Sequence, residues 1–318
     1  MMRSWIDEVL EKMDGGAVVR AVVVDARGSC PRDTGAAMLV GAGGSSGTIG
    51  GGALEHAITE QARFVIEENA GLAWFRHETR FQLGPELNQC CGGAMSVLLE
   101  RYGESERSTL QVLAQIGTGV VVQRPLTTGT PLAIANCGSV TGLSRETFGV
   151  AIFAEPLAMP RQSLVIYGAG HVARAVVRAL EGLPFEITWA DEEAGRFPVA
   201  APIGVTMLAT SDIDRAVNAA RMDALHLVMT RSHALDEAIV AAILRRGAFG
   251  YLGLIGSATK KARFRQRLAK AGFTDADIGR MICPIGLAEL RGKSPAEIAI
   301  GVAADLLRRF GSQPSNSD

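Results

Sequence analysis

The stretch Leu164-Val165-Ile166-Tyr167-Gly168-Ala169-Gly170-His171-Val172-Ala173 decides the fold of the second half of this chain. A short apolar run, typical of a buried strand, leads into a glycine-rich turn of the form G-x-G-x-x-A and then into a helical stretch. Gly168 and Gly170 allow a tight turn in which a pyrophosphate can approach the helix N-terminus, where free N–H groups favour an anion. Asp191 ends the next expected strand, where an acidic residue would bind a ribose 2′-hydroxyl. A bound dinucleotide and a purely structural glycine turn both explain the pattern.

Beyond this stretch, short apolar runs alternate with longer helical runs up to the end of the chain. Such alternation is typical of a parallel sheet with helices on both faces. The expected strands are Leu164–Tyr167, Glu186–Ala190, Gly204–Leu208, Ala224–Met229 and Gly250–Ile255, and the expected helices are His171–Leu180, Leu235–Arg245, Lys260–Ala271 and Pro295–Arg309. We therefore predict a Rossmann-like, doubly wound domain over residues 163–312 and a disordered tail over residues 313–318.

Polar side chains follow several of these expected strands. His171 comes after the first strand, His233 after the fourth, and Ser257 with Lys260 and Lys261 after the fifth. Because ligands of such sheets bind at the carboxyl ends of the strands, we predict that His171, His233 and Ser257 contact a ligand and that the lysines meet phosphate. Taken singly, each residue is also explained as a helix cap or as a solvated side chain.

The first 115 residues follow a different pattern, in which short apolar runs alternate with glycine-rich turns. The expected elements are a helix within Met1–Gly16, strands at Val18–Val24, Ala36–Val40, Trp74–Phe81 and Met95–Leu99, and a helix at Leu54–Glu67. This mixture predicts an N-terminal α+β module, so that the whole chain is an α/β protein. Residues 116–162 are expected to connect the domains, with one strand at Val120–Val122, a loop-like stretch at Pro125–Leu143 and a linker at Ala154–Gln162.

Composition and charge exclude several classes of function. The 318 residues include 32 Lys and Arg and 33 Asp and Glu, so the net charge of −1 gives no long-range attraction to nucleic acid or to an anionic membrane. The uncharged window at residues 34–54 is too rich in glycine for a membrane span, and the first residues lack the pattern of a secretory signal. We expect a cytoplasmic protein that binds neither nucleic acid nor membrane.

A second glycine-rich loop lies in the N-terminal module. Thr48-Ile49-Gly50-Gly51-Gly52 leads directly into the expected helix, and successive glycines expose backbone N–H groups that form a nest for phosphate. A tight turn without a ligand explains this loop equally well. Upstream, Arg32 lies in a turn that begins at Gly28 and is available for an anion.

The peptide Gln89-Cys90-Cys91-Gly92-Gly93 contains two of the five cysteines of the chain. The cysteines are odd in number and have no C-x-x-C spacing, so neither a disulfide framework nor a structural zinc site is indicated. A thiolate is a nucleophile and a soft ligand, and the following glycines let a bulky ligand approach the backbone. We predict that one of Cys90 and Cys91 supplies the thiolate that acts as nucleophile or ligand, and that the other supports it. We expect His56 and His77 to be structural. Two small buried thiols are the alternative explanation.

Six motifs in this order resemble the XdhC family, the xanthine dehydrogenase accessory proteins. They are residues 28–32 (GSCPR), 47–52 (GTIGGG), 83–93 (LGPELNQCCGG), 168–173 (GAGHVA), 253–257 (GLIGS) and 283–287 (CPIGL). The resemblance implies an accessory protein, not an enzyme, that binds molybdenum cofactor, protects it while a cysteine desulfurase supplies the terminal sulfur, and delivers it to apo-xanthine dehydrogenase. We accordingly expect xanthine dehydrogenase and a cysteine desulfurase as partners, and a homodimer as the assembly.

On this hypothesis, Arg32, the loop Thr48–Gly52 and the peptide Gln89–Gly93 form the site for molybdopterin. The anionic phosphate of the cofactor would suit the glycine nest, and its dithiolene-bound metal would suit a thiolate. The sequence departs from the family pattern at two positions. Asn88 stands where the family usually has Gly, and Arg231 replaces the first His of a Thr-His-x-His peptide, which leaves only His233 there.

Two other hypotheses remain open from the residues alone. The first is an NAD-dependent oxidoreductase that uses Gly168, Gly170 and Asp191, with His171 or His233 as acid or base. The second makes the Rossmann-like domain an empty platform on which partner proteins dock.

Overall fold

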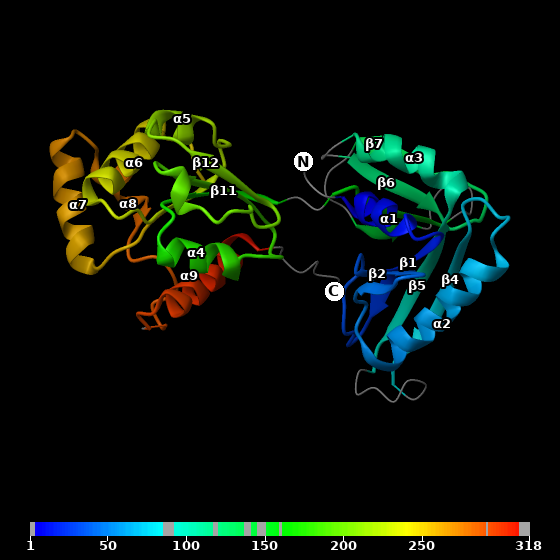
Figure 1. The fold of residues 1–318 in the computed structure, drawn as a ribbon. Coiled ribbons are helices and arrows are strands. Elements are labelled where there is room, and N and C mark those ends of the chain that lie inside the picture. The colour runs from blue at the N-terminus through cyan, green and yellow to red at the C-terminus, as the bar shows by residue number, and fades with distance from the viewer. Residues whose placement is uncertain are drawn as a thin grey trace. The chain divides into compact units, whose positions relative to one another are not determined.

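A computed structural model of the chain describes residues 4–84, 92–116, 120–136, 141–144, 151–158, 161–290 and 292–311. The chain divides into two compact units, Met1–Pro160 and Arg161–Asp318, each with its own sheets and helices (Figure 1). The expected fold class is confirmed, because an α+β unit precedes a unit built on a six-stranded parallel sheet.

The first unit contains three helices and two antiparallel sheets within the described residues. The helices are α1 (Trp5–Met13), α2 (Gly52–Glu68) and α3 (Glu104–Ala114). The larger sheet has the order β3-β2-β1-β5-β4, with β1 (Val18–Arg27), β2 (Ala37–Gly41), β3 (Gly44–Gly47), β4 (Arg76–Gln82) and β5 (Ala94–Tyr102). The smaller sheet has the order β7-β6-β9-β8, with β6 (Val120–Pro125), β7 (Ala133–Asn136), β8 (Gly142–Ser144) and β9 (Ile152–Pro156).

The central strand β1 is buried on both faces, which explains its nearly continuous apolar sequence. Successive side chains of a strand point to opposite faces. Val19, Ala21 and Val23 therefore belong to the core beneath α2, whereas Val22 packs on the other face with Phe153 of β9.

A buried ion network links the two sheets of the first unit. Arg20 of β1 and Arg124 of β6 both contact Glu155 of β9, at 2.9 and 2.7 Å, and Arg124 also lies 3.1 Å from Glu100 of β5. Arg76 of β4 completes the network at 3.2 Å from Glu100. Burial alone would raise the pKa of Glu155, but Arg124 and Arg20 together lower it below its ordinary value. The network therefore holds charged groups deep in the unit by pairing them.

The connecting region differs from the expectation. The strand expected at Val120–Val122 is found within β6, but the stretch expected as loop contains β7, and the expected linker begins inside β9. Strands as short as β7 and β8 show too few residues for a recognisable alternation. Pro156 favours a linker in the sequence, yet it ends β9, because proline is tolerated at a strand end, where its missing donor costs little.

The second unit contains every strand and helix that the sequence predicts for it, and adds several short elements. Its sheet has the order β12-β11-β10-β13-β14-β15, with β10 (Gln162–Tyr167), β11 (Phe185–Asp191), β12 (Val205–Ala209), β13 (Leu225–Val228), β14 (Tyr251–Leu254) and β15 (Met281–Ile282). Its helices are α4 (His171–Ala179), the 3-10 helix η1 (Ala194–Arg196), α5 (Ile213–Asn218), α6 (His233–Arg246), α7 (Ala258–Lys270), α8 (Asp275–Gly279) and α9 (Pro295–Phe310).

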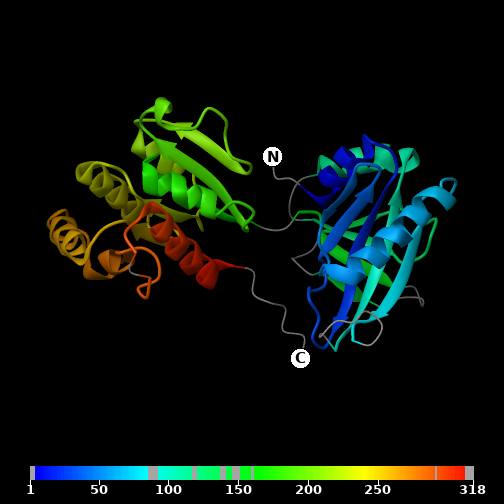
Figure 2. The same cartoon turned by 60° about the horizontal axis from the view of Figure 1, so that its bottom comes forward.

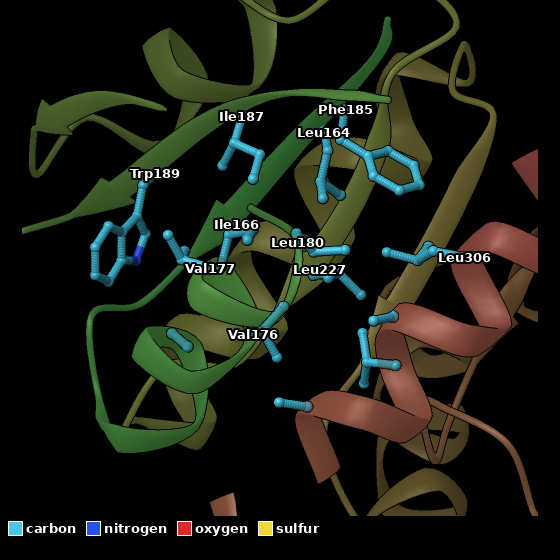
Figure 3. Packing of buried hydrophobic residues seen from close by; sticks show 14 of the residues in the cluster. Leu164, Ile166, Val176, Val177, Leu180, Phe185, Ile187, Trp189, Leu227 and Leu306 are labelled. Atoms are coloured by element: carbon cyan, nitrogen blue, oxygen red, sulfur yellow. The ribbon is translucent and has the colours of Figure 1, made fainter. Parts of the chain in front are cut away.

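Helices cover both faces of this parallel sheet. On one face, α4 and α9 lie side by side (Figure 2), and Val176 and Leu306 pack with Leu227 of β13 (Figure 3). On the other face, Val165 of β10 packs with Ile239 of α6 and with residues of α5, α7 and α8. Because all six strands are parallel, their carboxyl ends lie along one edge of the sheet, where ligands of such sheets bind.

Candidate functional site

Three sequence motifs of the first unit lie against one another. They are the turn Gly28–Arg32 after β1, the glycine loop Thr48–Gly52 between β3 and α2, and Gly93 before β5. A Cβ placed on Gly50 would lie only 2.5 Å from Cγ of Pro31, so the glycine loop packs directly on the turn. Residues far apart in the sequence thus come into contact.

Gly93 has no space for a side chain. A Cβ at this position would lie 2.6 Å from the carbonyl oxygens of Arg27 and Ser29 and 2.8 Å from Sγ of Cys30. The thiol of Cys30 lies 3.4 Å from the carbonyl oxygen of Ala94, within reach of a weak hydrogen bond. Glycine is therefore required at residue 93 if β5 is to start this close to the turn.

The cysteine pair lies outside the described residues, which exclude 85–91. On either side of that stretch, the N–H of Leu83 donates to the carbonyl oxygen of Gly93 at 3.0 Å. Gly92 is exposed, and no heavy atom of the described residues lies within 4 Å of the position a Cβ would take. The roles of Gln89, Cys90 and Cys91 stay predictions. The described end of their peptide, however, lies at the Cys30 turn.

A carboxylate of α2 occupies the predicted phosphate nest. The N–H groups of Ile49 and Gly51 each donate to Oε1 of Glu55 at 2.9 Å, and the Thr48 hydroxyl donates to the same oxygen at 2.6 Å. Burial would raise the pKa of Glu55, but the hydrogen bonds from Thr48, Gly51 and Ile49 lower it below its ordinary value. Donors that the sequence assigns to a phosphate are therefore already bound within the chain.

Arg32 and the three glycines of the loop stay at least partly accessible. Gly50, Gly51 and Gly52 all have positive φ, at 133°, 77° and 62°, and no heavy atom of the described part of the chain lies within 4 Å of a Cβ position on Gly51. Arg32 is exposed and makes no hydrogen bond or ion pair with another residue of the described segments. Its guanidinium is therefore available to an anionic ligand.

The fingerprint loop Gly168–Gly170 of the second unit is closed in a similar way. Gly168 has a φ of 104°, and a Cβ there would lie 2.6 Å from the carbonyl oxygen of Met229. The N–H of Ala169 donates to Oδ2 of Asp191 at 2.7 Å, and the N–H of Glu193 donates to Oδ1 at 3.0 Å. Both oxygens of Asp191 are thus engaged by the backbone, although the sequence assigns this carboxylate to a ribose.

The crevice at the switch point between β10 and β13 is small. It has a volume of about 30 Å³ beside Gly168 and Thr230, and Ile213, Leu235 and Ile239 line it. This volume is well below the roughly 300–1,000 Å³ of small-molecule sites. Gly170 and His171 are exposed at the start of α4. Because Asp191 is already bound by the backbone and Gly168 packs against Met229, the hypothesis of an NAD-dependent oxidoreductase is not favoured.

A buried carboxylate, Asp236, organises the ends of β13 and β14. Oδ1 of Asp236 accepts hydrogen bonds from the N–H and the hydroxyl of Thr230, at 3.0 and 2.8 Å, and Oδ2 lies 2.6 Å from Nζ of Lys260. Lys260 also donates to the carbonyl oxygen of Ile255 at 2.9 Å. Lys260 is thus an internal ion-pair partner as well as a candidate for phosphate.

Ser257 and His233 lie at the N-terminal ends of α7 and α6. The hydroxyl of Ser257 accepts from the N–H of Lys260 at 3.3 Å, so the capping role that the sequence allows is confirmed. His233 is exposed as the first residue of α6, after the N-cap Ser232. Arg231, which departs from the family pattern, pairs with Glu193 at 2.6 Å.

Neither Glu55 nor Asp236 is predicted from the sequence as a site residue, although one signal marks both. Each is the fourth residue of its helix, counting from Gly52 in α2 and from His233 in α6. A carboxylate at that position can turn back toward the loop that precedes the helix, where the positive end of the helix dipole favours it. An acidic residue four positions into a helix after a polar or glycine-rich loop is therefore worth testing as a loop anchor.

Two absences apply to the described part of the chain. No group of three or more His, Cys, Asp or Glu side chains could hold a metal ion there, which leaves His56 and His77 without a metal partner set. No described helix is both long and apolar enough to cross a bilayer.

The fold and the loops define the class of the protein as a two-unit α/β protein with a C-terminal Rossmann domain. Residues 164–306 match the model of the XdhC Rossmann domain, and residues 12–75 match that of the XdhC and CoxI family. The two matches together cover about two thirds of the chain. The chain belongs to the XdhC family.

Two known proteins resemble this chain over nearly its whole length. An uncharacterised protein of Escherichia coli K12, YqeB, is 28% identical over 302 residues, which are 92% of this chain and 44% of that protein. The chain therefore spans less than half the length of this curated relative. A crystal structure from Bacillus halodurans, described as a xanthine dehydrogenase, matches with a TM-score of 0.77 and 22% identity, covering 99% of this chain and 98% of the other. At that identity the likeness supports the fold alone.

Proposed function

We propose that this protein binds molybdenum cofactor and serves the maturation of xanthine dehydrogenase. Membership of the XdhC family supports a role in that maturation. The observation that carries the cofactor site is the contact of the Gly28–Arg32 turn with the glycine loop at Gly50 and with Gly93. The peptide that contains Cys90 and Cys91 leads into that contact.

The residues around this contact suit a large cofactor that carries a phosphate and a sulfur-bound metal. At Gly51 and Gly92, no other described residue fills the space where a side chain would stand. Arg32 offers to a phosphate a charge that has no partner among the described residues, and a thiolate from Cys90 or Cys91 would suit a soft metal. We assign the phosphate to Arg32 first, because Glu55 already holds the N–H groups of Ile49 and Gly51.

In this role the cofactor is cargo. The protein would hold it while a cysteine desulfurase supplies the terminal sulfur, and would then release it to apo-xanthine dehydrogenase without a reaction of its own. Backbone donors and one arginine suit such a carrier, because each contact contributes modestly and the cargo can leave again.

Binding of purified molybdopterin to variants of the full chain tests this proposal. We expect Arg32→Gln to weaken binding about tenfold, since it removes a charge-assisted hydrogen bond, and Cys90→Ser with Cys91→Ser to abolish retention of the metal-loaded form. Arg63→Gln on α2 is the matched control, because it removes the same charge from an exposed side chain. Equal binding by wild type, Arg32→Gln and the double cysteine variant would contradict the proposal.

A further inference from the structure

A cavity at the carboxyl ends of β13 and β14 has a different character from the two glycine loops. It has a volume of about 440 Å³ and opens beside the first residues of α6 and α7. The charged and titratable side chains that line it are Arg231, His233, Lys260, Arg263 and Arg267. No Asp or Glu belongs to its lining among the described residues. We call it the α6–α7 pocket.

Buried interactions fix the floor of this pocket. The side chain of Lys260 is only 12% exposed and is held between Asp236 and the carbonyl oxygen of Ile255. Its stem crosses Gly256 so closely that a Cβ there would lie 2.5 Å from Cδ of Lys260. A glycine at residue 256 thus lets the lysine fold back, and its side chain lines the pocket from a fixed position.

The pocket has an excess of positive charge. Arg231, Lys260 and Arg267 each pair with a carboxylate outside the lining, namely Glu193, Asp236 and Glu237. Arg263 makes no hydrogen bond or ion pair within the described segments. One full charge therefore remains, and each N-terminus of α6 and α7 adds roughly half a charge. The sum is close to the charge of about −2 on a phosphate monoester at neutral pH.

We propose that the α6–α7 pocket binds the phosphate group of a small organic phosphate monoester. Thr259 lines the pocket, and the N–H groups of Ala258 and Thr259, in the first turn of α7, have no acceptor within the helix. Ile255 and Phe264 supply an apolar wall for the organic part. The volume lies in the range of small-molecule sites, roughly 300–1,000 Å³. A nucleoside monophosphate and a phosphorylated pterin both carry this chemistry.

This site belongs to the second unit and does not depend on the proposed function of the first. It also differs from the fingerprint loop, whose Ala169 N–H is held by Asp191.

Calorimetric titration of the full chain with AMP, with metal-free molybdopterin and with adenosine tests the proposal and separates the two sources of the phosphate. Arg263→Gln removes the unpaired charge, and Arg178→Gln on the exposed side of α4 is the matched control.

We expect at least one of the two phosphate-bearing probes to bind and adenosine not to bind. The affinity should fall about tenfold in Arg263→Gln and stay unchanged in Arg178→Gln. It should also fall as ionic strength rises, because screening weakens exposed charges. Arg263 is exposed, so the variant should fold, which a thermal unfolding curve checks. Failure of both AMP and molybdopterin to bind, or equal affinities in the two variants, would overturn the proposal.

Discussion

The glycine loop of the first unit and the fingerprint loop of the second share a backbone design but differ in the carboxylate that closes them. Glu55 gathers three donors on one oxygen, is partly exposed and has no basic partner in the described segments. The side chain of Asp191 is only 8% exposed, binds two backbone N–H groups through separate oxygens, and lies 3.7 Å from Nε of Arg196.

This difference bears on which loop a ligand can enter. A phosphate competing with Glu55 displaces an accessible carboxylate that water can then solvate, which costs little. A phosphate competing with Asp191 must expel a carboxylate from a nearly buried position and leave Arg196 without that neighbour. We therefore expect the first loop to be the more readily opened. A glycine-rich loop is not vacant merely because its backbone could bind an anion.

The largest effect is expected for a carboxylate more deeply buried than either loop anchor. Glu100 is 1% exposed and lies among Arg20, Arg76 and Arg124, so Glu100→Gln leaves buried positive charge without its partner. The variant should lose about 3–5 kcal/mol in free energy of unfolding. Urea unfolding measures this loss. If Glu100→Gln loses no more free energy of unfolding than the loop variants below, then burial does not determine how strongly each of these carboxylates stabilises the fold.

The two units should also differ in their response to acid. Burial, with a smaller contribution from Arg246, lowers the pKa of His226 in β13 from 6.5 to about 4. As pH falls, His226 is therefore protonated in the unfolded state before it is protonated in the folded state. Its full contribution to the free energy of unfolding is present above pH 6.5, and about 3 kcal/mol is lost as pH drops toward 4. In the first unit, Glu55 and Glu155 have lowered pKa values, so their contribution is lost only below pH 4.5.

Hydrogen exchange followed by mass spectrometry, peptide by peptide, separates the units in this pH range. Peptides of the second unit should lose protection between pH 6.5 and 4 before those of the first unit, after correction for the intrinsic exchange rate. His226→Leu should flatten that dependence. Loss of protection in both units at the same pH would contradict the assignment to His226.

Asp191→Ala should destabilise the second unit by about 2 kcal/mol, since it removes two charge-assisted hydrogen bonds at a nearly buried site. Thermal unfolding reports the loss. Glu186→Ala, which removes an exposed carboxylate from the same strand, is the matched control and should change little. Equal effects of the two substitutions would mean that Asp191 does not brace the fingerprint loop.

Glu55→Ala should cost less, about 1 kcal/mol, because the carboxylate is partly exposed and water can replace it. Amide exchange at Ile49 and Gly51 should become faster, and phosphate should bind the freed N–H groups more tightly than it binds wild type. Unchanged exchange at both amides would show that Glu55 does not hold the loop closed.

The second unit was predictable from sequence because its elements are long and regular. The apolar run before Gly168 and the helical runs after each strand indicate a parallel sheet, and all five expected strands are found. The small sheet of the first unit was not predictable, because β7 and β8 have only four and three residues. Their pairing with β6 and β9 is a tertiary effect that no local pattern records.

The candidate site was predictable as a set of motifs but not as a set of contacts. The glycines at positions 50, 93 and 168 are explained by close approaches to Pro31, Ser29 and Met229, and no sequence pattern names those partners. The same limit applies to Glu55 and Asp236, whose oxygens bind loops rather than a ligand. Backbone geometry can be inferred from glycine, but what fills the space beside it depends on the whole fold.

Transfer of cofactor to apo-xanthine dehydrogenase tests the proposed function most directly. The full chain is loaded with molybdenum cofactor, separated from unbound cofactor and mixed with the apo-enzyme, and xanthine oxidation is measured. We predict more activity than the same amount of free cofactor gives, and no such gain from the variant with both Cys90→Ser and Cys91→Ser. Activation no better than with free cofactor, or equal activation by the double variant, would contradict the carrier role assigned to this site.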